Sequence, residues 1–189
     1  MIFTHAFAGA VLGKYIINKQ EKTSKIGKRE INIIYFLTIV GAIFPDLDFL
    51  AVFIDNSTHH RYLVTHSFVF YTILLLILWV LKKKINFIYS LSFYIGVLSH
   101  LILDFFTGGL AALAPFSFVG YGVPIRFSNL GGAIYVSTYL KSNYMLAETM
   151  IFLWFLFIVY KNEQSIIAKK LPIFFFWVSC VVLALVCVL

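Results

Sequence analysis

Apolar residues fall into six long runs that are separated by short polar segments. A helix that crosses a bilayer needs about 20 predominantly apolar residues. The pattern therefore predicts an all-α, polytopic helical bundle with about six transmembrane helices, and a single integral membrane domain over residues 1–189. The first, third and fifth runs are short, so we expect their helices to extend into flanking residues. The runs cover approximately residues 2–17, 31–54, 67–81, 85–106, 146–160 and 171–189.

The composition supports a membrane protein. Hydrophobic residues make up 61% of the chain and charged residues 12%, whereas a soluble domain has about 25% charged residues. The net charge of +7 would suit a nucleic-acid partner if the basic residues formed one patch. They lie instead between the apolar runs, where they determine topology. We therefore expect membrane lipids, and no nucleic acid, as partners.

The basic residues also predict an orientation. Twelve of the fifteen Lys and Arg residues flank or occupy alternate connections between the runs. The positive-inside rule places those connections in the cytoplasm. We expect a multi-pass protein of the cytoplasmic (inner) membrane with both termini outside. The twelve residues are Lys14, Lys19, Lys22, Lys25, Lys28, Arg29, Lys82, Lys83, Lys84, Lys161, Lys169 and Lys170.

Seven chargeable residues gather on the predicted outer side. An Asp at the centre of a membrane helix costs about 2.5–3.5 kcal/mol, so such groups need compensation. Imidazole and carboxylate together are the ligands of zinc, manganese and iron sites. We expect the seven to ligate or orient one or two divalent metal ions, with zinc as the first candidate and manganese, iron and magnesium as alternatives. They are His5, Asp46, Asp48, His60, His66, His100 and Asp104.

The spacing of these residues indicates shared faces. His100 and Asp104 are four positions apart, so they lie on one side of a helix. Pro45 precedes Asp46 and Asp48, and proline removes a backbone hydrogen bond that would continue the helix. The chain can therefore kink or end there, and both carboxylates can turn inward.

Glycines accompany two of the histidines. His5, Gly9 and Gly13 are spaced four apart, and Gly96 precedes His100 by the same interval. Small residues at this spacing let membrane helices approach each other closely. This pattern turns His5 toward protein rather than lipid.

The expected chemistry is hydrolysis. A bound divalent metal lowers the pKa of its water toward about 7, which generates a nucleophile. One of the carboxylates, Asp46 or Asp104, would serve as general base. Arg61 would neutralise an anionic substrate, since guanidinium binds oxyanions in a bidentate fork.

Further residues are candidates for substrate binding. Thr65 and Ser67 lie close to Arg61 and offer hydroxyl groups, and Arg126 is a second candidate for anion contact. The segment 108–131 is apolar and rich in glycine for an outer loop. We expect it to dip back into the interface and cover the site, where protein or a wet cavity satisfies its backbone.

Other interpretations remain open. A single intramembrane His or Asp can simply hydrogen-bond across helices, and an Asp-x-Asp after proline is often a turn. A metal or proton-coupled transporter also uses intramembrane His and Asp, but the inner halves of the runs carry only isolated polar residues such as Thr38, Thr72 and Ser92. A metal could also clamp the helices without any catalysis. The oligomeric state stays undetermined.

Four stretches together resemble the YdjM family, inner-membrane proteins described as LexA-regulated, membrane-bound metal-dependent hydrolases. The resemblance implies a hydrolase, and the similarity of family members to zinc-dependent phospholipase C proteins implies a phosphoester or lipid-derived substrate. Tyr62 stands where the family pattern has Gly, so either His59 or His60 is the ligand. The stretches are "THAFAG" from Thr4, "GAIFPDLD" from Gly41, "HRYLVTHS" from His60, and "GVLSHLILDFFTGG" from Gly96 followed by "APFS" from Ala114.

Overall fold

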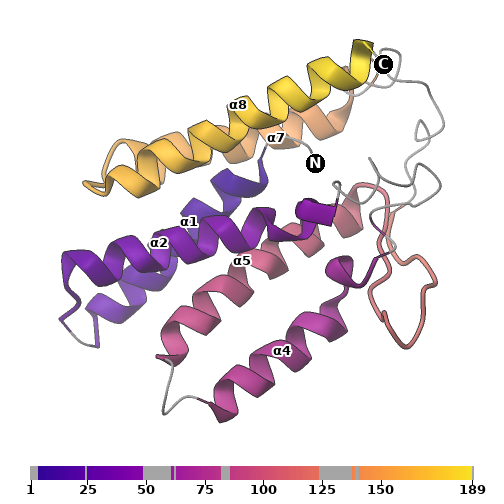
Figure 1. Ribbon diagram of the computed structural model, residues 1–189. Coiled ribbons are helices and arrows are strands. Elements are labelled where there is room, and N and C mark those ends of the chain that lie inside the picture. Colours follow the sequence, from indigo (N-terminus) through magenta and orange to yellow (C-terminus); the bar gives the residue numbers. More distant parts are fainter. Residues whose placement is uncertain are drawn as a thin grey trace.

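The chain folds into a bundle of α-helices. The computed structural model describes residues 4–23, 25–48, 61, 63–81, 86–123, 138 and 141–188. Each apolar run contributes one of six α-helices in these residues, so the all-α prediction is confirmed. The helices are α1 (His5–Glu21), α2 (Lys28–Ile43), α4 (Phe68–Val80), α5 (Phe87–Phe106), α7 (Asn143–Phe155) and α8 (Ile166–Val188), as Figure 1 shows.

Three segments in the described residues are long and apolar enough to cross a membrane. They are Lys28–Asp48, Phe87–Phe106 and Asn143–Tyr160. The last one joins α7 to the π-helical turn η4 (Leu156–Tyr160). The protein is therefore a helical membrane protein, whereas six crossings remain a prediction.

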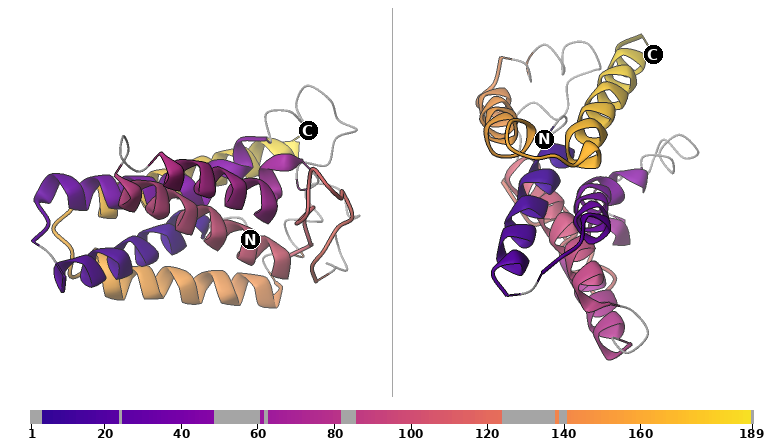
Figure 2. Two further views of the ribbon diagram at one scale, coloured as in Figure 1. Left: turned by 90° about the horizontal axis from the view of Figure 1, so that it is seen from below. Right: turned by 90° about the vertical axis from the view of Figure 1, so that its left-hand side faces the viewer.

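Helix α2 lies against both α1 and α5 (Figure 2), and glycines lie at both contacts. A Cβ on Gly9 would lie 2.6 Å from the carbonyl oxygen of Thr38, and a Cβ on Gly96 would collide with the same oxygen. Both positions therefore need glycine for the helices to approach. This confirms the interpretation of the glycine spacing as a close-packing pattern.

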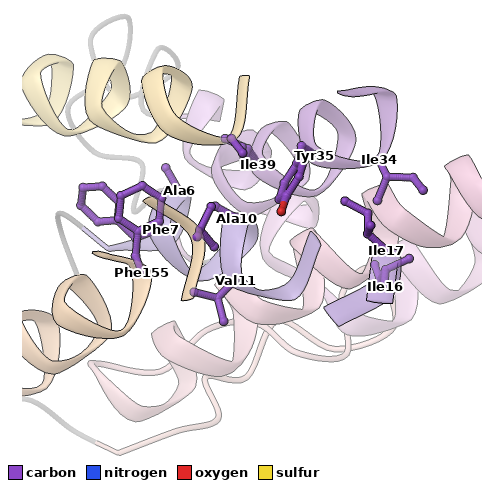
Figure 3. Packing of buried hydrophobic residues seen from close by; sticks show 12 residues of the cluster. Ala6, Phe7, Ala10, Val11, Ile16, Ile17, Ile34, Tyr35, Ile39 and Phe155 are labelled. Carbon is purple, nitrogen blue, oxygen red and sulfur yellow. The ribbon is translucent and has the colours of Figure 1, made fainter. Parts of the chain in front are cut away.

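The apolar core lies between α1, α2 and the pair formed by α7 and α8 (Figure 3). The rings of Phe7 and Phe155 lie 4.8 Å apart, and Tyr35 and Ile39 on α2 are fully buried. Aromatic pairs at this distance pack favourably beyond the area they bury. This core holds the C-terminal helices against the segment that carries His5.

A proline sets the end of α2. The helix stops at Ile43, and Phe44–Asp48 form a 3-10 turn, η1. Pro45 lacks the N–H that a continued α-helix would use, so the predicted break is confirmed. A second short turn, η3 (Val64–His66), lies against η1. The two turns bring Asp46, Asp48 and His66 to the end of α5.

The chain leaves α5 in an extended loop, Thr107–Val123, which is called the outer loop below after the side of the membrane on which the positive-inside rule predicts it. A single antiparallel bridge between Leu110 and Tyr121 closes its base. The backbone N–H of Val123 donates to the carbonyl of Phe105 at 2.8 Å, which returns the chain to the end of α5. Residues 124–131 of the predicted covering segment lie outside the described residues.

Candidate metal centre

Four side chains from three separate elements meet at one end of α5. Asp46 comes from η1, His66 from η3, and His100 and Asp104 from the last two turns of α5. Each offers one ligand atom, and these four atoms all lie within 4.8 Å of one another. The two His and Asp104 are buried, while the side chain of Asp46 is 34% exposed. The Asp46 side of the group therefore lies at the surface of the protein, whereas the other three donors are enclosed.

The spacing of three of the four atoms fits the ligands of a tetrahedral ion. The Nε2 atoms of His66 and His100 are 3.3 Å apart. Asp104 Oδ2 lies 3.5 Å and 3.4 Å from these two nitrogens, and Asp46 Oδ1 lies 3.9 Å and 3.6 Å from them. Ligands about 2.0–2.1 Å from a tetrahedral zinc ion lie roughly 3.3 Å from one another. The two nitrogens and Asp104 Oδ2 match this spacing, whereas Asp46 Oδ1 lies farther from His66 Nε2.

Hydrogen bonds orient both imidazoles for metal binding. The Nδ1–H of His100 donates to the carbonyl oxygen of Ala42 at 2.8 Å. A carbonyl oxygen can only accept, so the proton is on Nδ1 and the lone pair is on Nε2. The Nδ1 atom of His66 lies 2.8 Å from Asp48 Oδ2, so its N–H donates to that carboxylate. Such partners fix the tautomer of metal-ligating histidines in known sites.

The electrostatics of the group call for a positive charge. Burial lowers the pKa of His66, but its hydrogen bonds with Asp104 and Asp48 outweigh burial and raise the pKa to about 9. The carboxylates therefore favour a cation at Nε2 of this ring. A proton on Nε2 supplies this positive charge. A divalent ion that replaced the proton would supply it as well and could contact the other donors of the group.

Asp48 supports the group from behind His66. Its Oδ2 atom accepts hydrogen bonds from His66 Nδ1 and from the Thr65 hydroxyl. Asp48 was expected to ligate or orient the metal, and its position fits orientation. The Thr65 hydroxyl donates to Asp48. This contact does not test the expected binding of substrate by Thr65, which stays a prediction.

His5 and Arg61 approach the other oxygen of Asp104. Arg61 Nη2 donates to Asp104 Oδ1 at 3.1 Å, and Arg61 Nη1 donates to the carbonyl of Thr107 at 2.7 Å. His5 Nε2 lies 3.6 Å from the same Oδ1 atom, and its ring stacks on His100 with centroids 4.0 Å apart. Both residues therefore border the four-atom group from the Asp104 side.

Ser67 has structural contacts. Its hydroxyl accepts from the Phe70 N–H, which caps α4, and it lies within hydrogen-bonding distance of the Ala112 and Ala114 carbonyls. Its predicted role in substrate binding is not tested by these bonds.

His60 and Arg126, the two remaining predicted site residues, lie outside the described residues. The carbonyls that hold His100 and Arg61 were not predicted, because backbone atoms carry no residue-type signal.

Comparison with known proteins gives one family. No curated protein and no solved structure matches the chain. The profile of a family described as YdjM inner membrane protein matches residues 1–186. The match includes the two C-terminal helices, which carry none of the four resembling stretches. The chain belongs to the YdjM inner membrane protein family.

Proposed function

We propose that this membrane protein is a metal-dependent hydrolase that acts on a phosphoester or lipid-derived substrate at the outer face of the membrane. The observation that carries the proposal is the buried group of two imidazoles and the Asp104 carboxylate at ligand spacing, with the partly exposed carboxylate of Asp46 beside it. When bound, a divalent ion would activate water as a nucleophile at neutral pH. Zinc is the first candidate because the donor set is His and Asp.

The four donors divide naturally into three ligands and a base. His66, His100 and Asp104 are buried and mutually 3.3–3.5 Å apart. Catalytic zinc sites typically use three protein ligands and keep a fourth position for water or substrate. Asp46 is the most exposed donor and lies 3.9 Å from His66 Nε2. In this proposal Asp46 takes the proton from the attacking water.

In the proposed reaction Arg61 holds Asp104 in place and brings a positive charge to the site. Its bonds to Asp104 Oδ1 and to the Thr107 carbonyl fix the guanidinium beside the group. From there its positive charge favours an anionic substrate over a neutral one. Asp104 in turn is held so that Oδ2 stays directed at the two histidines.

We further propose six crossings with both termini outside. Helix α2 begins at Lys28 and Arg29 and leads to Asp46 and Asp48 at its other end. The metal group and the basic residues therefore occupy opposite ends of α2, as the positive-inside rule requires for an outer site. Cysteines introduced at Thr23 and Tyr121 should be labelled from opposite sides of the membrane.

A transporter is the alternative, and one observation favours it. A second polar cluster, formed by Lys14, Tyr35 and Glu163, lies toward the other end of α1 and α2. Thr38 is placed between the two clusters, but its hydroxyl donates only to carbonyls of its own helix within the described residues. A polar path is thus interrupted there, which favours the one-sided enzyme.

Metal analysis combined with a hydrolysis screen tests the proposal. Purified wild type should contain a divalent metal and cleave a phosphoester or lipid, while His100→Ala and Asp104→Ala should lose both properties. Ser99→Ala is the matched control, since its hydroxyl is bonded to the Gly96 carbonyl of the same helix. No metal in any variant would refute the proposal. Metal retained by wild type without turnover would favour a structural clamp, and metal uptake by vesicles would favour the transporter.

A further inference from the structure

The outer loop carries large apolar side chains on its surface. Phe116, Val119 and Phe118 are 79%, 60% and 54% exposed. No charged residue occurs between Asp104 and Arg126. Exposed apolar patches of this kind, without charged neighbours, mark binding sites for other molecules or membranes.

The loop is fastened to the metal centre at two points. The Ala111 N–H donates to the carbonyl of Arg61 at 3.0 Å, and Arg61 in turn holds Asp104. Ser67, the neighbour of His66, has its hydroxyl within hydrogen-bonding distance of the Ala114 carbonyl. The apolar tip is therefore held in a defined place beside the candidate site, beyond the end of α5 (Figure 1).

The candidate membrane span that leads into the loop also exposes apolar side chains. Ile102 and Phe106 on the last turns of α5 are 48% and 57% exposed, and α5 is one of the candidate spans. By contrast, the connection between α1 and α2 contains Lys22 and Lys25, and α2 begins with Lys28 and Arg29. Lipid is thus the occupant that fits the outer loop, because the loop exposes Phe and Val side chains, contains neither basic nor acidic residues, and follows directly on a candidate membrane span.

We infer that the outer loop is immersed in the lipid interface and forms an apolar rim through which a long-chain amphiphile reaches the metal centre from the bilayer. The inference rests on the proposed function and specifies its substrate: a membrane amphiphile rather than a water-soluble ester. The polar head of such a molecule meets the exposed Asp46 side of the group, and its chain lies along Phe116 and Phe118. Burial of a chain against aromatic side chains supplies the binding free energy.

Fluorescence quenching locates the loop without any need for turnover. In a background with Trp79, Trp154 and Trp177 changed to Phe, a Phe118→Trp reporter is compared with a Thr23→Trp reporter in vesicles. Lipids brominated on the acyl chain should quench the Phe118→Trp reporter strongly and the Thr23→Trp reporter little. Aqueous acrylamide should give the reverse order. Thr23 is exposed in the basic connection, so it is the matched aqueous control.

Two results would overturn the lipid contact. Quenching of the Phe118→Trp reporter by acrylamide but not by brominated lipid would place the loop in water. Protection from both quenchers would mean that protein, such as a second copy of the chain, covers it.

Substrate length tests the rest of the inference. Phe116→Ser with Phe118→Ser should raise KM for a long-chain lipid ester on the order of tenfold and leave a water-soluble ester of the same headgroup unchanged. Phe157→Ser, at an equally exposed site on η4 that is 70% exposed, should affect neither. Equal loss on both substrates would overturn the amphiphile preference. If neither substrate is hydrolysed, the proposed function fails, while the quenching result still decides where the loop lies.

Discussion

The Nε2 atoms of His66 and His100 lie 3.3 Å apart, and each ring is held by a hydrogen bond at its other nitrogen. Burial lowers the pKa of His66, but its carboxylate partners raise it to about 9, so a proton on its Nε2 atom lies between the two rings at neutral pH. Asp104 Oδ2 adds a third electron-pair donor at 3.4–3.5 Å from both. The three donors therefore surround a position that suits a cation, either this proton or a divalent ion.

Asp48→Ala should weaken metal binding without abolishing it. The carboxylate bonds His66 Nδ1 at 2.8 Å and is not one of the four convergent donors. Loss of such an orienting partner typically costs about 10–100-fold in metal affinity. Competition with a metal-binding dye measures the change. Thr65→Val is the control, since it leaves the Asp48–His66 bond in place and should have a smaller effect. Complete loss of metal in Asp48→Ala, as in His100→Ala, would make Asp48 a ligand.

Wild type should bind one metal ion per chain. A second ion would need the Oδ1 side of Asp104, but the Arg61 guanidinium already lies 3.1 Å from that atom. For the same reason His5→Gln should retain the ion, because His5 Nε2 faces Oδ1 and not the four-atom group. Equilibrium dialysis followed by mass spectrometry of the metal gives the stoichiometry. Two ions in wild type and one in His5→Gln would instead make His5 a ligand of a second site.

Gly96→Ala should destabilise the bundle and disturb the metal centre together. A Cβ at this position would collide with the Thr38 carbonyl oxygen and lie 2.9 Å from the Ala42 nitrogen. Overpacking of this kind costs roughly 1–3 kcal/mol. Because the Ala42 carbonyl orients His100, separation of α2 from α5 should also lower metal affinity. Thermal unfolding in detergent and dye competition measure the two effects.

Gly27→Ala is the control for this substitution. A Cβ there would meet only Glu30 Oε2, at 3.9 Å. It should leave metal affinity unchanged. Equal metal binding by wild type and Gly96→Ala would show that the contact between α2 and α5 does not determine the geometry of the centre.

The local sequence pattern predicted which helices and turns carry the site, but it did not predict which carboxylate faces the four-atom group and which one orients a histidine. The apolar runs predicted the helices, Pro45 predicted the end of α2, and the interval from His100 to Asp104 predicted a shared face, because each depends on neighbouring residues alone. The different positions of Asp46 and Asp48 were not predicted. They are two residues apart in a tight turn, and which one faces the group depends on where η3 packs.

The sequence also predicted that two hydroxyl groups near the site bind the substrate, because it does not show which groups tertiary packing places beside them. Thr65 and Ser67 are polar and adjacent to His66, but their partners are Asp48 and the backbone of the outer loop. Such partners are brought together by tertiary packing of segments that are distant in sequence. No spacing rule within one segment could have indicated them.

Glu163 joins the C-terminal helices to the rest of the bundle. Lys14 Nζ and the Tyr35 hydroxyl donate to its Oε2 atom at 2.7 Å and 2.9 Å. Burial raises the pKa of Glu163, but these hydrogen bonds outweigh burial and hold the pKa below its ordinary value of 4.5. Since the unfolded chain then binds the proton more readily than the folded one, the stabilisation is complete at neutral pH. It is lost as the pH falls below about 4.5 toward the folded-state pKa.

Glu163→Gln should therefore lower the unfolding temperature at pH 7 and matter progressively less in acid. Hydrogen bonds to a charged group contribute about 1.5–3 kcal/mol, which corresponds to several degrees for a chain of this size. Thermal unfolding of both proteins in detergent from pH 7 to pH 3.5 gives the difference at each pH. Glu30→Gln, at an exposed carboxylate that accepts only from the Gly27 N–H among the described residues, should unfold like wild type throughout. A difference between wild type and Glu163→Gln that stayed constant down to pH 3.5 would mean that the side chain stabilises the fold by packing rather than by its charge.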